Sequence, residues 1–328
     1  MKTMLLSMDD VKKSLSMAQV IAAVEEGYLA FEAGKVQQPD IVSMEMPEYN
    51  GETDIKSCCN DLNQTVSVKI ASGFYDNGKI NDLPTMIGTI LLLDGKTGET
   101  ACIMDGSLIT GIRTGAAGAI SSKLLARQDS KTTAVLGAGG QARMQIYGLC
   151  QVLDIETIKV YSPNPQNLAA YKADVEEETG KKVVCCSSVA EAMEDADIAI
   201  STTPSKAFLA DSSLVRPGMH IVAVGADMAG KNEWDPEIFK GAKIVNDSIP
   251  QCISRGETRN ALLAGVITED DIYGEIGEIL AGKKAGRESA EEITIFDTTG
   301  MGIQDNVTAM KVYEAAKENG LGQWFQFL

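Results

Sequence analysis

Residues 132–150, TTAVLGAGGQARMQIYGLC, decide the fold class of this chain. The apolar run at 133–136 predicts a buried strand, and a helix is predicted to follow. Between them Gly137, Gly139 and Ala142 have the Gly-x-Gly-x-x-Ala spacing of a dinucleotide-binding turn. The first glycine permits a tight turn, the second lets a pyrophosphate approach the backbone, and the helix N-terminus offers free N–H groups. The alternative is a plain strand–helix turn that binds nothing, so the rest of the chain has to decide.

The segments after this turn alternate between short apolar strands and helices. The predicted strands are 155–162, 182–188, 197–204, 220–226, 242–248 and 292–300, and the clearest helices are 167–180 and 189–196. Such alternation builds a parallel sheet covered by helices. We therefore predict an α/β fold with a Rossmann-type doubly wound parallel sheet.

The N-terminal third has a different pattern. A helix is predicted from Ser16, which can cap it, to Gly34, which can end it. Strands without intervening helices follow at 41–46, 65–71 and 86–94. We expect a separate α+β substrate-binding and dimerisation domain over residues 1–117, completed by 304–328, with the dinucleotide-binding domain over 118–303. A last helix is predicted from Asn306 to Gly320.

Composition restricts the class of protein. The chain has 328 residues, enough for two domains, and a net charge of −17, which argues against a nucleic-acid partner. No apolar run approaches the ~18 residues that span a bilayer, and the N-terminus lacks the apolar segment of a signal peptide. Seven cysteines lack metal-ligand spacing, and His220 is the only histidine, so we predict no metal. We expect a cytoplasmic protein with reduced thiols, in which His220 is a buried structural residue.

Ligands of an open α/β sheet bind beyond the carboxyl ends of its strands, and three such ends carry polar residues. Thr202 and Thr203 are small groups suited to lining a nicotinamide ribose. Asp227 and Asp297 also follow strands, where an aspartate can relay protons. For either aspartate the alternative is a cap or turn residue.

Two cationic residues stand in unusual surroundings. Lys69 interrupts the apolar strand TVSVKIASG, where a lysine either extends to solvent at a sheet edge or points into a site. Arg113 lies among small residues in GIRTGAAG, and it fits binding of phosphate or carboxylate as well as capping of a helix. The pattern alone favours neither reading.

Ser162 ends the second strand of the dinucleotide domain, in IKVYSPNP. An Asp or Glu usually stands there and binds the ribose 2′-hydroxyl of NAD. Asn164 is nearby, but this segment has no arginine to bind a 2′-phosphate. We predict NAD or NADP as cofactor, with NADP allowed because the repelling acid is absent.

Six stretches carry a resemblance to a known family: LPTMIG, MDGSLITGIRTGAAG, VLGAGGQA, STTPS, VGADMAGKNEWDPE and GRESAEEITIFDTTGMGIQD. Over nearly its full length the chain resembles the ornithine cyclodeaminase/mu-crystallin family, most of all its archaeal alanine dehydrogenase branch. The resemblance implies a homodimer whose N-terminal part binds the substrate and whose middle is a Rossmann domain. It also implies interconversion of amino and imino acids with a bound nicotinamide.

The resemblance also assigns roles to single positions. Lys69 matches the substrate-binding lysine, which binds a carboxylate and polarises a carbinolamine, and Asp227 matches the catalytic aspartate, a proton shuttle to the substrate nitrogen. Thr299 matches a substrate-side position. The matching cofactor positions are Thr85, Arg113, Gly140, Gln141, Val224, Lys231 and Thr298, in addition to Gly137, Gly139, Ser162, Thr202 and Thr203 discussed above.

Asp40 is a departure from the family, whose members commonly carry a basic residue shortly after the proline matched by Pro39. Lys56 or Arg113 would then anchor the substrate carboxylate, or Asp40 attracts a distal amine of a different substrate. The leading prediction is an NAD(P)-dependent amino-acid dehydrogenase or imine reductase acting on a small amino or imino acid. One alternative is an ornithine cyclodeaminase. The other is a non-catalytic mu-crystallin-like binder of NADPH or a small ligand, and the presence of Lys69 and Asp227 argues against this second alternative.

Overall fold

The computed structural model describes residues 2–327, except for the side chain of Lys79. The chain forms two compact units. Unit 1 comprises Met1–Arg113 and Met301–Leu328, and unit 2 comprises Thr114–Gly300. Helix α4, Ser107–Leu125, contains the first division between them.

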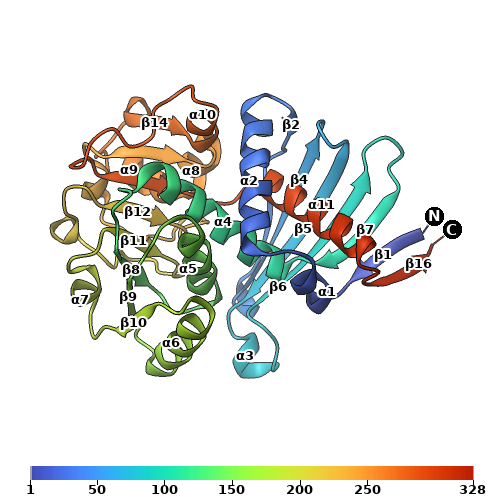
Figure 1. Cartoon of the computed structure of the whole chain (residues 1–328), viewed down its shortest axis with the longest axis horizontal. Coiled ribbons are helices and arrows are strands. Elements are labelled where there is room, and N and C mark those ends of the chain that lie inside the picture. The colour runs from blue at the N-terminus through green and yellow to red at the C-terminus, as the bar shows by residue number, and fades with distance from the viewer. Residues whose placement is uncertain (1, 328) are drawn as a thin grey trace. The chain divides into compact units, whose positions relative to one another are not determined.

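Unit 2 is built on one parallel sheet with helices on both of its faces (Figure 1). Its strands are β8 Thr132–Leu136, β9 Thr157–Tyr161, β10 Lys182–Cys185, β11 Ile198–Ser201, β12 His220–Ala223, β13 Lys243–Asn246, β14 Ile272–Glu275 and β15 Thr294–Asp297. They lie in the order β10-β9-β8-β11-β12-β15-β13-β14. The order reverses between β8 and β11, as in dinucleotide-binding sheets. The predicted Rossmann-type fold is confirmed.

The helices of unit 2 connect these strands. They are α5 Gly140–Val152, α6 Pro165–Thr179, α7 Val189–Met193, α8 Ile249–Arg255, α9 Glu257–Leu263 and α10 Ile276–Leu280, with short 3-10 helices at Ser212–Leu214, Pro236–Phe239 and Glu269–Asp271. All strand pairs in this sheet are parallel, and one row of cross-strand partners runs along Tyr161, Leu136, Ser201, Ala223, Asp297 and Asn246. Each of these six residues is the last of its strand. The six strands therefore end in one row, and the loops that follow them lie along the same edge of the sheet.

Unit 1 is built on a mixed sheet. Its strands are β1 Lys2–Leu6, β2 Val36–Gln37, β3 Val42–Met46, β4 Gly51–Asn60, β5 Thr65–Phe74, β6 Met86–Asp94, β7 Thr100–Asp105 and β16 Gln323–Gln326. The order is β16-β1-β7-β6-β5-β4-β2, with β3 paired to β4. Its helices are α1 Met8–Ser14, α2 Met17–Glu32, α3 Asn77–Ile80 and α11 Gly302–Glu318, with a 3-10 helix at Pro47–Tyr49.

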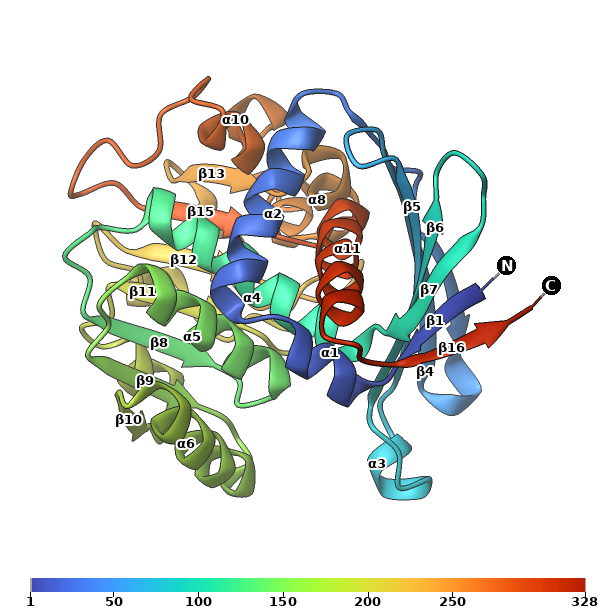
Figure 2. The ribbon, with the colours of Figure 1, turned by 45° about the vertical axis from the view of Figure 1, so that its right-hand side comes forward.

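Helices α2 and α11 lie side by side on one face of the unit 1 sheet (Figure 2). Ser16 caps α2 in a capping box with Gln19, and Gly34 adopts φ +67° just beyond its end, as its sequence predicts. Gly27 lets the helices approach, because a Cβ there would stand 3.2 Å from Val307 of α11. Among the described residues, neither of these two long helices of unit 1 covers the opposite face of the sheet, which we call its open face (Figure 2).

Two differences from the sequence prediction affect the site. Strand β4 is absent from the prediction, because Glu52, Asp54 and Lys56 interrupt its apolar alternation. Helix α11 begins at Gly302 rather than at Asn306. The sequence did not reveal this earlier start, because the first turn contains the polar residues Gln304 and Asp305. Both are buried although their types are usually exposed.

His220 is fully buried in unit 2, where its two ring nitrogens lie 2.9 Å from Thr294 Oγ1 and 3.3 Å from Ser121 Oγ. Burial lowers the pKa of this imidazole to about 3, which fits the predicted structural role. All seven cysteines are free thiols. Within residues 2–327, no helix is both long and apolar enough to cross a membrane.

Candidate active site

The glycine turn of unit 2 leaves space next to its backbone. Gly137 adopts φ +109°, and a Cβ on it would meet Thr202 Oγ1 at 2.9 Å. A Cβ on Gly139 or Gly140 would meet nothing within 4 Å. The side-chain amide nitrogen of Gln141, Nε2, is buried and has no hydrogen-bond partner among the described residues. This open cradle, with an unpartnered side-chain donor at the start of α5, fits the pyrophosphate of a dinucleotide.

Ser162 follows β9, beside the glycine turn in the row of strand ends, and is 9% exposed. Its hydroxyl accepts a hydrogen bond from the Asn164 N–H at 3.3 Å. Asn164 in turn caps α6 by accepting from the N–H groups of Gln166 and Asn167. Ser162 is thus held in place by the start of α6, where an acid would stand in an NAD-specific turn.

The loops after β11 and β12 bring three further predicted residues to the same edge. The Thr202 N–H donates to Leu136 O at 3.0 Å, and the Val224 N–H donates to Ser201 O at 3.2 Å. The Thr203 N–H donates to the buried carboxylate of Glu233 at 2.5 Å. These bonds fix both loops to the sheet.

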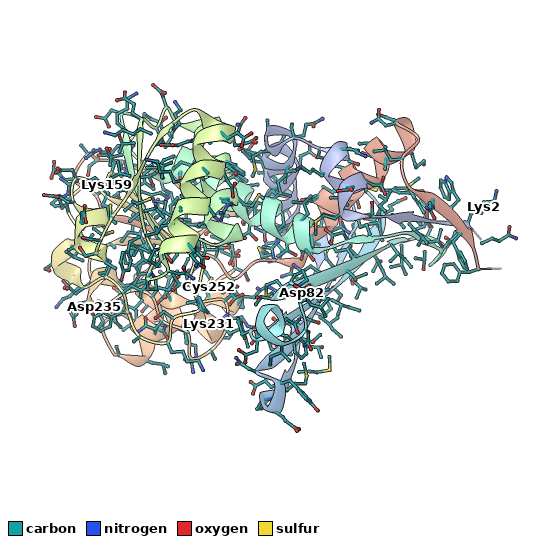
Figure 3. All side chains as sticks on the ribbon, turned by 90° about the horizontal axis from the view of Figure 1, so that it is seen from below. Lys2, Asp82, Lys159, Lys231, Asp235 and Cys252 are labelled. Carbon is teal, nitrogen blue, oxygen red and sulfur yellow. The ribbon has the colours of Figure 1, made fainter. Side chains whose placement is uncertain are left out.

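Asp227 lies in the loop after β12, and its side chain is 49% exposed. Lys231, which Figure 3 labels, is 13% exposed and donates to Asp227 Oδ1 at 2.6 Å. An exposed carboxylate with one adjacent ammonium can accept or release a proton without leaving a buried charge behind.

Thr298 and Thr299 follow β15 and are both buried. Thr298 Oγ1 donates to Asp247 at 2.6 Å, and the Gly300 N–H donates to the same carboxylate oxygen at 2.8 Å. Gln251 of α8 donates to Thr299 Oγ1 at 3.0 Å. The structure therefore places the unit 2 residues predicted for the site along one edge of the sheet.

Besides Asp247, three buried carboxylates lie at this end of the sheet, and none of them except Asp297 was assigned a role from the sequence. Burial raises the pKa of Glu233 to about 7, that of Glu257 to about 8 and that of Asp297 to about 7. Glu257 Oε1 accepts from the Glu233 N–H at 2.5 Å, and Asp297 Oδ2 accepts from the Thr258 N–H at 2.8 Å. Asp297 thus has a buried structural position rather than that of a proton relay in contact with solvent.

Unit 1 contains a buried group of charges that we call the cation cluster: Lys56, Lys69, Arg113 and Asp305. Lys69 Nζ lies 2.7 Å and 2.9 Å from the two carboxylate oxygens of Asp305. Arg113 Nε lies 3.0 Å from Asp305 Oδ1, and Lys69 and Asp305 are each 1% exposed. Lys69 therefore points under the helices and not to solvent at a sheet edge.

The register of the sheet adds Lys56 to this cluster. Lys56 on β4 is the cross-strand partner of Lys69 on β5, and it is 9% exposed. Burial, with Arg113 and Lys56 close by, lowers the pKa of Lys69 to about 7 although Asp305 opposes this shift. The surrounding cations hold the pKa of Asp305 below its usual value. Three cationic side chains thus surround one carboxylate.

A second layer of hydrogen bonds holds Arg113 in position. Arg113 Nη1 donates to Gln304 Oε1 at 2.9 Å, and Gln304 Nε2 donates to the Tyr28 hydroxyl of α2 at 2.6 Å. Sequence reasoning missed Asp305 and Gln304, although both stand in the quoted stretch GMGIQD. The available signal was a pair of polar residues at the start of the last helix.

Two predicted residues of unit 1 do not join the cation cluster. Thr85 is exposed in the loop before β6, where its carbonyl accepts from the Phe74 N–H at 2.8 Å. Asp40 is exposed in the segment after β2. Asp40 is therefore not the buried carboxylate that balances the cluster; Asp305 occupies that position.

These features define the class of the protein: a Rossmann-type dinucleotide-binding unit combined with an α+β unit that holds a buried cation cluster. The chain belongs to the ornithine cyclodeaminase/mu-crystallin family, whose model matches residues 1–320. The predicted family is thereby confirmed.

Three relatives illustrate the similarity. Alanine dehydrogenase of Archaeoglobus fulgidus is 37% identical over 100% of this chain and 99% of its own length. The solved Δ1-pyrroline-2-carboxylate reductase of Thermococcus litoralis, in complex with NADH and L-proline, is 36% identical, with a TM-score of 0.95 over 98% of this chain and 99% of that one. An archaeal alanine dehydrogenase dimer with bound NAD is 36% identical, with a TM-score of 0.94 over 100% of both chains.

Proposed function

We propose that this chain is an NAD(P)-dependent oxidoreductase that interconverts a small amino acid and its imino or keto acid, as an alanine dehydrogenase or a ketimine reductase does. The observation that carries the proposal is the cation cluster, in which Lys56, Lys69 and Arg113 surround the single carboxylate of Asp305. A substrate carboxylate would bring a second negative charge to these three cations, which favours its binding.

The same cluster argues for an oxidoreductase over the alternatives. A diamino acid such as ornithine would bring an additional ammonium close to Lys56 and Lys69, where like charges repel. A cyclodeaminase is therefore disfavoured. A protein that only binds a nucleotide has no use for three buried cations in a unit without the glycine turn, because burying each charge costs free energy.

Each unit supplies a separate part of the chemistry in this proposal. In unit 2 the glycine turn, from Gly137 to Gln141, holds the pyrophosphate, with Ser162 at the adenosine ribose. The nicotinamide, when bound, exchanges hydride with the substrate Cα. In unit 1 Lys69 and Arg113 bind the substrate carboxylate, and the Lys69 ammonium polarises the carbinolamine oxygen.

Asp227 completes the proposed chemistry. Its exposed carboxylate accepts a proton from the substrate nitrogen during oxidation and returns it during reduction. Lys231 Nζ, 2.6 Å from Asp227 Oδ1, holds the carboxylate in place with a charge-assisted hydrogen bond. The remaining predicted contacts to the cofactor are Thr85, Arg113, Thr202, Thr203, Val224, Lys231 and Thr298, and the remaining substrate contacts are Lys56 and Thr299.

We also propose that the chain is a homodimer that pairs through the open face of the unit 1 sheet. Because Thr65, Ser67 and Lys69 of β5 face the helices, the alternate residues face the other side. One row of partners on that side is Leu5, Ile103, Leu91 and Val68, across four strands. Such an apolar row suits contact with a second copy of the chain.

The test of the proposed function is a substrate screen in both directions. L-alanine, L-proline and L-ornithine are supplied with NAD⁺ and with NADP⁺, and pyruvate with ammonia is supplied with the reduced cofactors. Net reduced cofactor from alanine or proline is expected. Ammonia from ornithine without net reduced cofactor would instead identify a cyclodeaminase, and nucleotide binding without any turnover would identify a binder.

A further inference from the structure

Glu233 is a fully buried carboxylate of unit 2 that touches two strand-end loops at once. Its Oε1 accepts from the Thr203 N–H after β11 at 2.5 Å, and its Oε2 accepts from the Gly225 N–H after β12 at 2.9 Å. Gly225 lies two residues before Asp227. We propose that Glu233 is the positioning residue that fixes the Asp227 loop to the end of β11. The inference rests on the proposed role of Asp227.

The missing side chain of Gly225 is an independent sign of this arrangement. A Cβ at this position would stand 2.3 Å from Glu233 Oε2 and 2.3 Å from Thr203 O. Gly225 has a negative φ, so glycine is needed here for space rather than for backbone conformation. The carboxylate of Glu233 occupies the room that a side chain at position 225 would need.

The other end of the Asp227 loop is fastened to the same group of residues. Asn260 Nδ2 donates to Lys231 O at 2.8 Å and to Glu257 Oε2 at 3.2 Å. Glu257 Oε1 accepts from the Glu233 N–H at 2.5 Å. Residues 225–231 are therefore held at both ends by one buried network centred on Glu233.

This anchoring has a chemical purpose. Asp227 and Lys231 both belong to this loop, so their contact with each other, at 2.6 Å, does not fix the loop to the sheet. A proton shuttle works only when it stands within hydrogen-bond reach of the reacting nitrogen. A displacement of ~1 Å can reduce the rate by about a hundredfold. Glu233 thus acts on the reaction through Asp227 without touching the substrate.

Glu233→Gln tests the proposal directly, because a glutamine can accept one of the two N–H bonds but presents an NH2 group to the other. Asp197→Asn is the matched control. Asp197 also accepts two backbone N–H bonds, from Lys131 and Thr132, but it does so before β11, at the opposite edge of the same sheet. Turnover is measured with L-alanine or L-proline, whichever the wild-type chain oxidises. The rate is divided by the concentration of NADH-binding sites, so that only folded protein is counted.

In Glu233→Gln we expect kcat to fall about 10- to 100-fold while KM changes less than about threefold, because position rather than binding is lost. With substrate deuterated at Cα or with solvent D2O, the isotope effect on kcat should rise as the chemical step becomes limiting. Misfolding alone would not raise it. Asp197→Asn should leave kcat and the isotope effects unchanged. A Glu233→Gln enzyme with wild-type kcat and isotope effects would overturn the proposal.

Gly225→Ala keeps the proposal testable where Glu233→Gln does not fold, because the new methyl group displaces the carboxylate of Glu233 and the Thr203 carbonyl, the two groups that join the loops. It should reproduce the kinetic defect, and the double variant should be no worse than either single one. Independent, multiplying defects would contradict the proposal.

A wild-type chain without turnover would reject the proposed function but would still leave Glu233 testable. Amide hydrogen exchange of residues 225–231 should be faster in Glu233→Gln than in wild type and Asp197→Asn. Unchanged exchange would reject the positioning role by itself.

Discussion

Lys69 and Asp305 form a buried ion pair in which both carboxylate oxygens lie within 2.9 Å of one ammonium, although the two residues stand 236 positions apart in the chain. The pair joins β5 to the first turn of α11. Because Arg113 shares the same carboxylate, removal of Asp305 deprives two buried cations of their ion-pair partner. Asp305 therefore stabilises the fold and sets the charge of the proposed substrate site.

Asp305→Asn should lower the free energy of unfolding by about 3–5 kcal/mol, the usual cost of leaving a buried charge without its partner. Glu314→Gln is the control on the same helix, because its ion pair with Lys311 is exposed and 3.6 Å long. That change should cost less than about 1 kcal/mol. Urea unfolding of both variants measures the difference, and equal costs would refute the special role of Asp305.

Lys69→Met should abolish turnover and leave the affinity for NADH nearly unchanged, because Lys69 lies in unit 1 and the glycine turn lies in unit 2. The wild-type affinity for propionate, a carboxylate without the amino group, should fall as pH rises through about 7, since the Lys69 pKa of about 7 marks the loss of its ammonium charge. Calorimetric titration from pH 5.5 to 9 measures this affinity. Retention of the same pH dependence in Lys69→Met would disprove the assignment.

Ser162→Asp should turn the cofactor preference toward NAD. A carboxylate at the end of β9 repels a 2′-phosphate, so KM for NADP⁺ should rise at least about tenfold while KM for NAD⁺ changes little. Ser162→Asn, which is similar in size and uncharged, is the matched control. If both variants weaken NADP⁺ equally, charge at this position does not decide the preference.

Stability should depend on pH through the buried carboxylates of unit 2. The pKa of Glu257 is raised to about 8, so between pH 4.5 and 8 this group holds a proton in the folded state and releases it on unfolding. Its contribution to stability is therefore complete below pH 4.5 and is lost as pH rises through 8.

Glu257→Gln removes this titration. Relative to wild type, the variant should gain up to about 1.4 kcal/mol of stability per pH unit over that window, which corresponds to one proton. Denaturant midpoints from pH 5 to 9 provide the measurement. A difference between the two proteins that does not vary with pH would show that Glu257 is ionised throughout.

Val68→Glu should weaken the proposed dimer, because it places a charge in the apolar row on the open face of the unit 1 sheet. Leu62→Glu is the control, since Leu62 is already 64% exposed at the turn between β4 and β5. Sedimentation equilibrium gives the dimer affinity of each variant. Equal affinities, or a monomeric wild type, would reject this face as the interface.

The sequence by itself determined the parts that depend on local geometry. Gly137 adopts the left-handed backbone that its place in GAGGQA requires, and the alternation of strands and helices after it yields the parallel sheet. Seven of the eight strands of unit 2 were predicted, each within three residues of its observed end, so most residues at the sheet edge were predictable; β14 was not predicted. Lys69 and Asp227 stood out by their places in the sequence, and the family resemblance supplied the roles proposed for them.

Only the tertiary structure decided which charges meet. Asp305 reaches Lys69 because α11 packs on β4 and β5, and no local pattern encodes that contact. The pairing of Lys56 with Lys69 depends on the register of β4 against β5. Strand β4 was not predicted, because its charged residues interrupt the apolar alternation. Glu233 likewise acquires its role from two strands that are neighbours only in the folded sheet. Local conformation follows from neighbouring residues, whereas a buried charge network depends on which distant segments the core brings together.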